Sequence, residues 1–248
     1  LSALPSSRTY VMGTHNLRNI STFELNVSEL NPGFITGYVG PESYEVFLIS
    51  ENPIGYWRLD ENSGTTFYDS SASANVHDAT YANTIAYGLT AGIAQQINRG
   101  KSITVADSSV SYPIVPYHAE LEFTDNSNDK AFSVSTWAKI DSGNSNGSGI
   151  FGRGSEYNLT ILANDLTFRL IDSDGGNQDI IIDQTNVPFG SWAHYAITYD
   201  GRGGATAYQG MKIYINGTEM TPDTFTADAG YVCMETQGSG AFNIGSSG

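Results

Sequence analysis

Acidic side chains gather in one short segment of this 248-residue chain, DSDGGNQD, which runs from Asp172 to Asp179. Within it, Asp172, Asp174 and Asp179 offer carboxylate oxygens, the ligands that a hard cation such as Ca²⁺ prefers. The segment lacks the bidentate Glu that completes an EF-hand loop, and strand-like sequence lies on both sides of it. It is therefore interpreted either as a cation-binding loop or, more simply, as a plain acidic loop between two strands.

Residue types for catalysis are present without the spacing that catalysis needs. Glycoside hydrolysis on a β-strand can use carboxylates spaced as E-x-D-x-x-E, because alternation places all three on one face. No Glu of this chain is followed by an Asp two positions later. The four His lie far apart, at positions 15, 77, 118 and 194, and no pair has the spacing of a zinc site. We predict no enzymatic activity, and interpret His194 as a structural residue within a strand.

Stacking of an aromatic ring on a ligand is the chemistry that remains. In the segment 131–140, alternation places Trp137 on the face opposite Phe132, Val134 and Ile140. An indole outside the core offers a flat apolar surface with a polar edge, which suits a sugar ring. The candidate ligand-binding residues are Trp137, Tyr157 and Arg153. The alternative is that a loop covers Trp137, since large aromatic side chains are seldom left bare.

Alternating apolar residues predict the β-strands that must position these side chains. The predicted strands cover residues 56–59, 102–105, 131–140, 150–151, 157–162, 166–171, 180–183, 191–200 and 211–215. Asn216-Gly217 is a strong signal for a hairpin turn. The polar segment Asp141–Gly149 is predicted to be a mobile loop. Short strands bounded by Gly, Asn and Asp are typical of an antiparallel, all-β protein.

Ahead of these strands, Pro41-Glu42-Ser43 followed by apolar residues predicts a short helix that ends near Ser50. Residues 1–40 contain two strand-like apolar stretches, 21–27 and 34–39. We expect residues 1–40 to form an arm and residues 41–248 to form one domain. Because apolar side chains on an arm need a surface to bury against, the arm is predicted to anchor the chain to other subunits of an assembly.

Three motifs together resemble the laminin-G-like domains of the concanavalin A-like lectin/glucanase group: YWRLDENSGT with YDSS, WAHYAITYD, and KIYING. The resemblance covers roughly Ser43 to Gly248. It implies an antiparallel jelly-roll sandwich with little helix, and a structural calcium near the opening loop with Asp69 and Asp78 as its carboxylates. Members of this group usually continue into a final acidic strand. That strand does not follow Phe242–Gly248 here, so we expect an open sheet edge that another chain can complete.

Composition narrows the range of partners. The chain has 11 Lys and Arg against 26 Asp and Glu, a formal net charge of −15, which opposes nucleic acid and anionic lipid. A lone Cys233 leaves no internal disulfide. No apolar run approaches the roughly 18 residues that a membrane span needs. We predict no binding to nucleic acid and no membrane insertion.

Two functions remain open after this search. The first is a non-enzymatic protein displayed on a surface, either a phage virion component such as a fibre or decoration protein, or a secreted bacterial adhesin, whose sandwich binds glycans or another surface. The second is a carbohydrate-binding accessory module of a secreted enzyme. Both place the chain outside the cell or on a virion.

Overall fold

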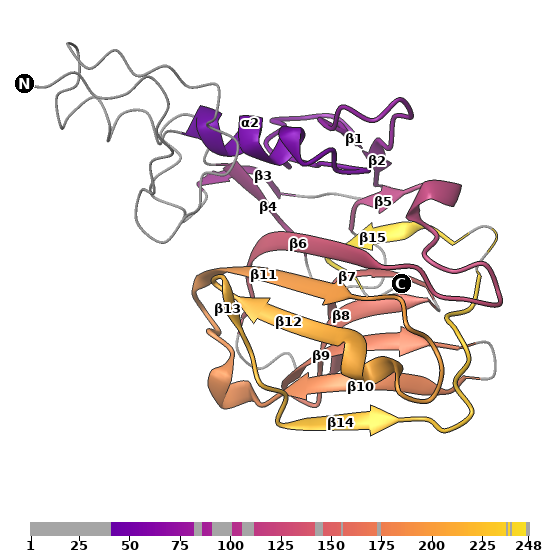
Figure 1. Ribbon diagram of the computed structural model, residues 1–248. Helices are drawn as coiled ribbons and strands as arrows, with labels where there is room; N and C mark the ends of the chain where they lie inside the picture. The colour runs from indigo at the N-terminus through magenta and orange to yellow at the C-terminus, as the bar shows by residue number, and fades with distance from the viewer. Residues whose placement is uncertain are drawn as a thin grey trace, which may run out of the picture.

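The computed structural model describes residues 41–81, 86–90, 101–105, 112–141, 146–154, 156–172, 175–236, 238 and 240–246. The fold is built on two antiparallel sheets that pack face to face as a sandwich, as Figure 1 shows with the small sheet in front of the large one. This is an almost entirely β structure, which confirms the predicted all-β class. The two predicted strand-like stretches within residues 1–40 lie outside the described residues.

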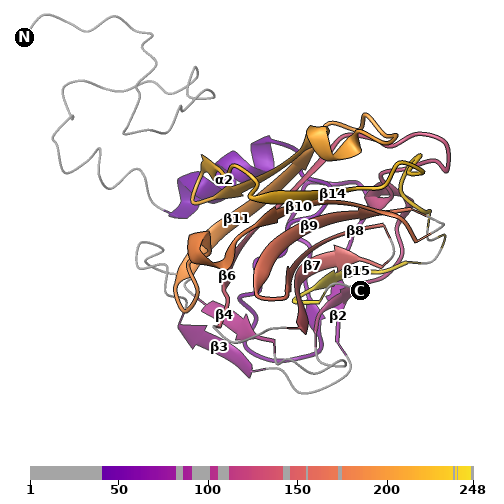
Figure 2. The same cartoon turned by 90° about the horizontal axis from the view of Figure 1, so that it is seen from below.

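The large sheet has nine strands in the order β1-β2-β5-β15-β7-β8-β9-β10-β14. Their bounds are β1 Thr66–Phe67, β2 Ala79–Thr80, β5 Ile114–Val115, β7 Asn146–Arg153, β8 Tyr157–Leu162, β9 Asp165–Ile171, β10 Asn177–Ile182, β14 Thr224–Ala227 and β15 Phe242–Ile244. The strand latest in sequence, β15, lies inside this sheet between β5 and β7. Figure 2, seen from below relative to Figure 1, also shows β15 beside β7.

The small sheet has four strands in the order β13-β12-β11-β6. Their bounds are β6 Phe132–Lys139, β11 Trp192–Tyr199, β12 Met211–Ile215 and β13 Thr218–Glu219. Two further strands, β3 (Ala86–Thr90) and β4 (Lys101–Thr104), pair with each other. Among the described residues, the helical elements are α2 Pro41–Ser50 and the single 3₁₀ turns η3 Ala119–Leu121, η4 Gln184–Asn186 and η5 Ala207–Gly210.

Period-two alternation explains how the small sheet faces the core. In β11 the side chains of Ala193, Tyr195, Ile197 and Tyr199 are buried, and the intervening ones are partly exposed. Phe132 of β6 joins the two sheets, because its ring contacts Tyr157 of the large sheet at 4.6 Å and Tyr199 of the small sheet at 6.0 Å between centroids. A continuous apolar core between the sheets follows from this pattern.

Most of the predicted elements are confirmed. The helix over Pro41–Ser50, the long strands β6 and β11, and β12 with its Asn216-Gly217 turn all lie where the pattern places them. Both turn residues have positive φ, 51° and 79°, as a tight hairpin of this kind requires.

Two predictions are wrong. The stretch Tyr56–Leu59 is not a regular strand: only Trp57 forms a β-bridge, with Asp69, and Leu59 has a φ of 55° that breaks extended structure. The segment Asp141–Gly149 is not a loop throughout, because β7 begins at Asn146 and pairs with β8. The Gly- and Ser-rich sequence gives no strand signal of its own, and the first residues of β7 form a strand because they pair with β8.

Candidate functional site

The outer face of the small sheet carries several aromatic side chains that lie outside the core. Trp137 on β6 lies opposite His194 on β11 in the strand register, and Ser135 and Tyr214 flank Ala196 in the next row. These residues alternate with buried ones, so the sheet itself directs them outward. Trp192, at the start of β11, lies on the same face. Trp192 and Tyr214 were not among the sequence candidates, although their alternation with buried residues was visible.

Trp137 is the centre of this surface. It is 39% exposed, and its ring lies 5.5 Å from the His194 ring at an angle of 58°. His194 is held by the hairpin that follows β12: its N–H donates to Asn216 Oδ1 at 3.0 Å, and its carbonyl accepts from the Asn216 N–H at 2.8 Å. Burial lowers the pKa of His194 below 6.5, so the imidazole is neutral at pH 7. The result is an uncharged aromatic surface on a rigid sheet.

Polar groups border this aromatic surface. The Tyr214 hydroxyl donates to Glu219 Oε2 at 3.2 Å, and Lys212 Nζ lies 3.0 Å from the same oxygen. Ser133 and Ser135 on β6 are exposed. Hydroxyl, carboxylate and ammonium groups around an aromatic platform are the donors and acceptors that a polyhydroxylated ligand requires.

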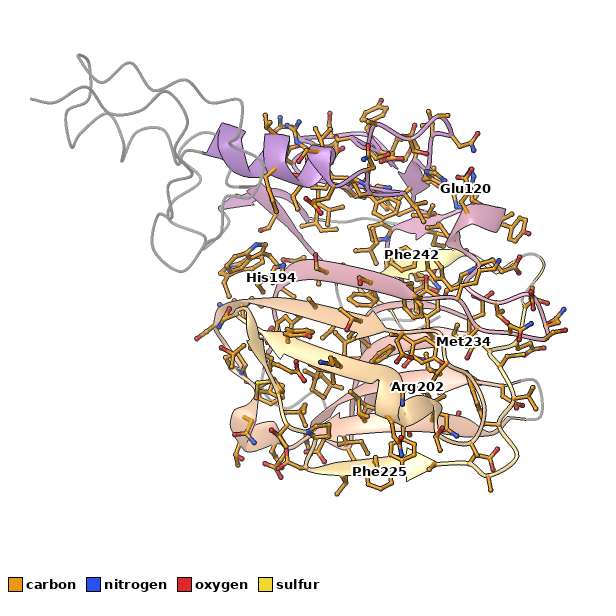
Figure 3. The ribbon with its side chains drawn as sticks, in the orientation of Figure 1. Glu120, His194, Arg202, Phe225, Met234 and Phe242 are labelled. Carbon is orange, nitrogen blue, oxygen red and sulfur yellow. The ribbon has the colours of Figure 1, made fainter. Side chains whose placement is uncertain are left out.

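A cavity of about 550 Å³ adjoins this face along β6. Its walls come from Asn52–Asp60, from Ala131–Trp137, and from Trp192 and His194. Its floor is formed by apolar core residues, among them Phe151 and Phe242. In Figure 3, His194 and Phe242 mark this side of the molecule, while Arg202 and Phe225 lie well away from it.

The other two predicted ligand-binding residues are buried. Tyr157 is fully buried between the sheets, where its ring contacts Phe132 at 4.6 Å and Phe123 at 5.7 Å. Arg153 is also fully buried: its Nε donates to the Gly240 carbonyl at 3.2 Å, and its Nη1 lies 3.4 Å from Glu156. Neither side chain lies on the outer face with Trp137.

The carboxylate of Asp69 is used within the opening loop. Its Oδ1 accepts the N–H groups of Tyr56 and Ser71, both at 2.9 Å, and its Oδ2 accepts the His77 N–H at 3.1 Å and the Ser71 hydroxyl at 3.0 Å. Burial raises the pKa of Asp69, but these hydrogen bonds outweigh it and hold the pKa below 3.8. Asp78 is likewise engaged, since its Oδ1 accepts the Asp69 N–H at 2.9 Å.

This donor set does not fit a calcium ion, because the oxygens that calcium would need from Asp69 already accept hydrogen bonds. Within the described ranges, no group of three or more His, Cys, Asp or Glu side chains is placed to hold a metal ion. The calcium site implied by the family resemblance is therefore left to a direct test with a chelator.

His77 was not recognised from the sequence. It is fully buried, with Nδ1 3.1 Å from Asp69 Oδ2 and Nε2 2.7 Å from Glu120 Oε2, and its ring contacts His118 at 4.4 Å. Glu120 is 43 residues away in sequence, so no local motif predicts this contact. The arrangement ties η3 to the opening loop.

The acidic segment Asp172–Asp179 does not form one loop, because its last three residues belong to β10. Asp179 lies within β10 and forms a paired ion contact with Arg169 of β9, at 2.8 Å for each of two hydrogen bonds. Asp172 is buried and accepts the Val232 N–H at 3.3 Å. Asp174 lies outside the described residues. Asp179 is thus neutralised by its neighbour on β9.

The matched family model is described as the concanavalin A-like lectin/glucanases superfamily, of the laminin-G type, and it covers residues 117–248. This match spans more than half of the chain. The chain belongs to this superfamily. The predicted resemblance is therefore confirmed, and the sandwich above is the jelly roll of the family. Comparison with curated proteins finds no match.

Solved structures share the architecture at low identity. The binding domain of Paraclostridial Mosquitocidal Protein 1 is 14% identical with a TM-score of 0.50, over 79% of this chain and 47% of that one. A mutant of HCR/D is 18% identical with a TM-score of 0.50, over 80% and 44% of the two chains. This chain spans less than half the length of either structure, and the likeness shows the fold alone. In the part of the chain that the structure describes, no helix has the length and apolarity to cross a membrane.

Proposed function

We propose that this chain is a non-enzymatic binding module that recognises glycans through the outer face of the small sheet. The observation that carries this proposal is the exposed indole of Trp137 beside neutral His194, on two long strands that fix both rings. A sugar ring can lie on such a surface with its C–H groups against the indole, while Ser135 and Tyr214 offer hydroxyl groups to its rim.

The absence of catalytic spacing in the sequence supports a binding role without turnover. A hydrolase of this kind would need carboxylates aimed at one point of the bound sugar. The carboxylate nearest the aromatic surface in register is Glu219, and it is engaged with Lys212 and Tyr214. The name of the mosquitocidal relative, a binding domain, agrees with this proposal.

Replacement of Trp137 tests the proposal. A glycan array on the whole chain identifies a ligand, and calorimetry then compares the chain with its Trp137→Ala variant. We expect the variant to lose affinity roughly tenfold, because about 1.4 kcal/mol of ring stacking is removed. Phe225→Ala is the matched control: Phe225 is also an exposed aromatic residue, but it stacks on Tyr208 away from this face.

Two outcomes contradict the proposal. The first is an unchanged affinity in Trp137→Ala together with a folded circular dichroism spectrum. The second is release of reducing sugar from the identified glycan by the unmodified chain.

A more specific role is display on a surface, either on a phage virion or as a secreted adhesin. The net charge of −15 supports this role, because it keeps crowded copies soluble and limits contact with nucleic acid. The alternative is an accessory module of a secreted enzyme. The genes beside this one distinguish them: virion structural genes favour display, and a hydrolase domain in the same reading frame favours the accessory module.

A further inference from the structure

Strand β6 has a partner on one side only among the described residues. All eight of its residues, Phe132–Lys139, are in register with β11, and the order of the small sheet ends at β6. Figure 1 shows β6 at the margin of the front sheet. An edge strand presents a row of backbone N–H and C=O groups that can pair with another strand.

The direction of the hydrogen bonds shows which groups this edge presents. The N–H and C=O of His194 both bond to Asn216, on the side away from β6. In an antiparallel pair, opposite residues either bond to each other or both point away. Trp137, opposite His194, therefore directs its N–H and C=O to the open edge. Ser135 and Ser133 do the same, since the pattern repeats every second residue.

The open edge borders the cavity of about 550 Å³ described above. The segment Asn52–Asp60 lines the same cavity, and within the described residues no β-bridge joins it to β6. Leu121, Phe123, Phe151 and Ile244 reach the cavity from the core. The space therefore offers backbone hydrogen-bonding groups along one wall and apolar contact at its floor, which together are complementary to an extended peptide.

We propose that this groove receives a β-strand from a separate polypeptide, antiparallel to β6. Alternation sets the chemistry of that strand: residues beside Val134 and Thr136 face the apolar floor, and residues beside Ser133 and Ser135 face water. Exposed Lys139 ends β6, so an acidic residue near the start of the incoming strand is favoured. Backbone pairing supplies affinity and the alternate side chains supply specificity.

The test uses a fluorescent eight-residue peptide of alternating Val and Thr that begins with Glu. Its affinity is measured for the whole chain and for Ser135→Pro and Ser135→Ala. Proline removes the N–H that faces the open edge and leaves the bonds to β11 intact, which is where strands tolerate proline. We expect Ser135→Pro to weaken binding at least about tenfold and Ser135→Ala to bind as the original chain does. Circular dichroism melting checks that both variants fold.

Residue-resolved hydrogen exchange separates a free edge from one that the same chain already fills. We expect the amides of Ser133, Ser135 and Trp137 to exchange quickly in the free protein and to become protected once the peptide is added. The amides of Val134 and Thr136 should be protected in both states. Strong protection of all five without peptide would overturn the proposal, because it would show an internal occupant. Failure of the peptide to bind, or equal binding by the two Ser135 variants, would overturn it as well.

Discussion

At the scale of single residues, Asp69 determines how the opening loop is held. One carboxylate accepts the N–H groups of Tyr56, Ser71 and His77, so three separate points of the loop converge on it. Hydrogen bonds to an ionised acceptor contribute more than neutral ones. Loss of this charge should therefore loosen the loop as a unit.

Replacement of Asp69 by Asn should lower the free energy of unfolding by about 2 kcal/mol at pH 7, because an amide cannot accept all of these donors. The pKa of Asp69 is lowered in the folded state, so its contribution is fully present above pH 3.8 and is lost as the pH falls through the folded pKa. Urea unfolding at several pH values measures the free energy of unfolding of both chains. The difference between Asp69→Asn and the original chain should shrink in acid. Asp141→Asn, at an exposed position, is the control, and equal stability of the two variants at pH 7 would contradict the prediction.

Residue roles were the least predictable from sequence, for a physical reason. Trp137 was located because strand alternation is local. The sequence predicts Tyr157 and Arg153 as ligand-binding residues, but both are buried, through contacts with Phe132, Phe242 and Gly240 elsewhere in the chain. Contacts between distant residues are set by the packing of the sheets, and no spacing within one segment reveals them.

At the scale of elements, the turn that follows β11 packs closely against the residues just before β6. Gly201 has a φ of 78°, and a Cβ added there would lie 2.6 Å from the backbone N of Ala131. Gly204, three residues later, has a φ of 69°, but a Cβ there would meet nothing within 4 Å. The two glycines thus share a backbone conformation and differ in the space around them.

Alanine at each glycine separates these two effects. We expect Gly204→Ala to cost about 1 kcal/mol, because only the positive φ is penalised. Gly201→Ala should cost roughly 2 kcal/mol more, since the methyl group collides with backbone that cannot rotate away. Chemical denaturation of both variants provides the comparison. Equal losses would show that the turn moves freely relative to β6.

Elements with strict alternation were predicted best, and β6 and β11 are within one residue of their expected ends. The start of β7 was missed because Asn146–Gly149 is a Gly- and Ser-rich sequence with no apolar periodicity, and pairing with β8 makes it a strand. The aromatic residues around Trp57 predict a strand, but the positive φ of Leu59 ends the extended backbone there. Trp57 therefore forms a single β-bridge, with Asp69.

At the scale of the whole molecule, divalent cations test the calcium role that the family resemblance implied. A cation bound only to the folded state raises the melting temperature by mass action. Because the oxygens of Asp69 are already used by N–H and O–H donors, we expect EDTA to leave the melting temperature unchanged at pH 7. Magnesium and calcium added separately are the controls. A decrease with EDTA that calcium alone restores would show that the folded chain binds calcium and would contradict this expectation.

The position of β15 inside the large sheet affects the order in which the chain can fold during synthesis. Residues Phe242–Ile244 bridge β5 and β7, which precede them by about a hundred residues or more. Within the described sheet only β15 joins β5 to β7, so before this strand has emerged from the ribosome we expect the facing edges of β5 and β7 to be unpaired. Long-range pairing of this kind slows folding and leaves strand edges open to other chains. Nascent chains arrested before residue 242 should therefore depend on a chaperone that shields β-strands, and that dependence should end once β15 has emerged.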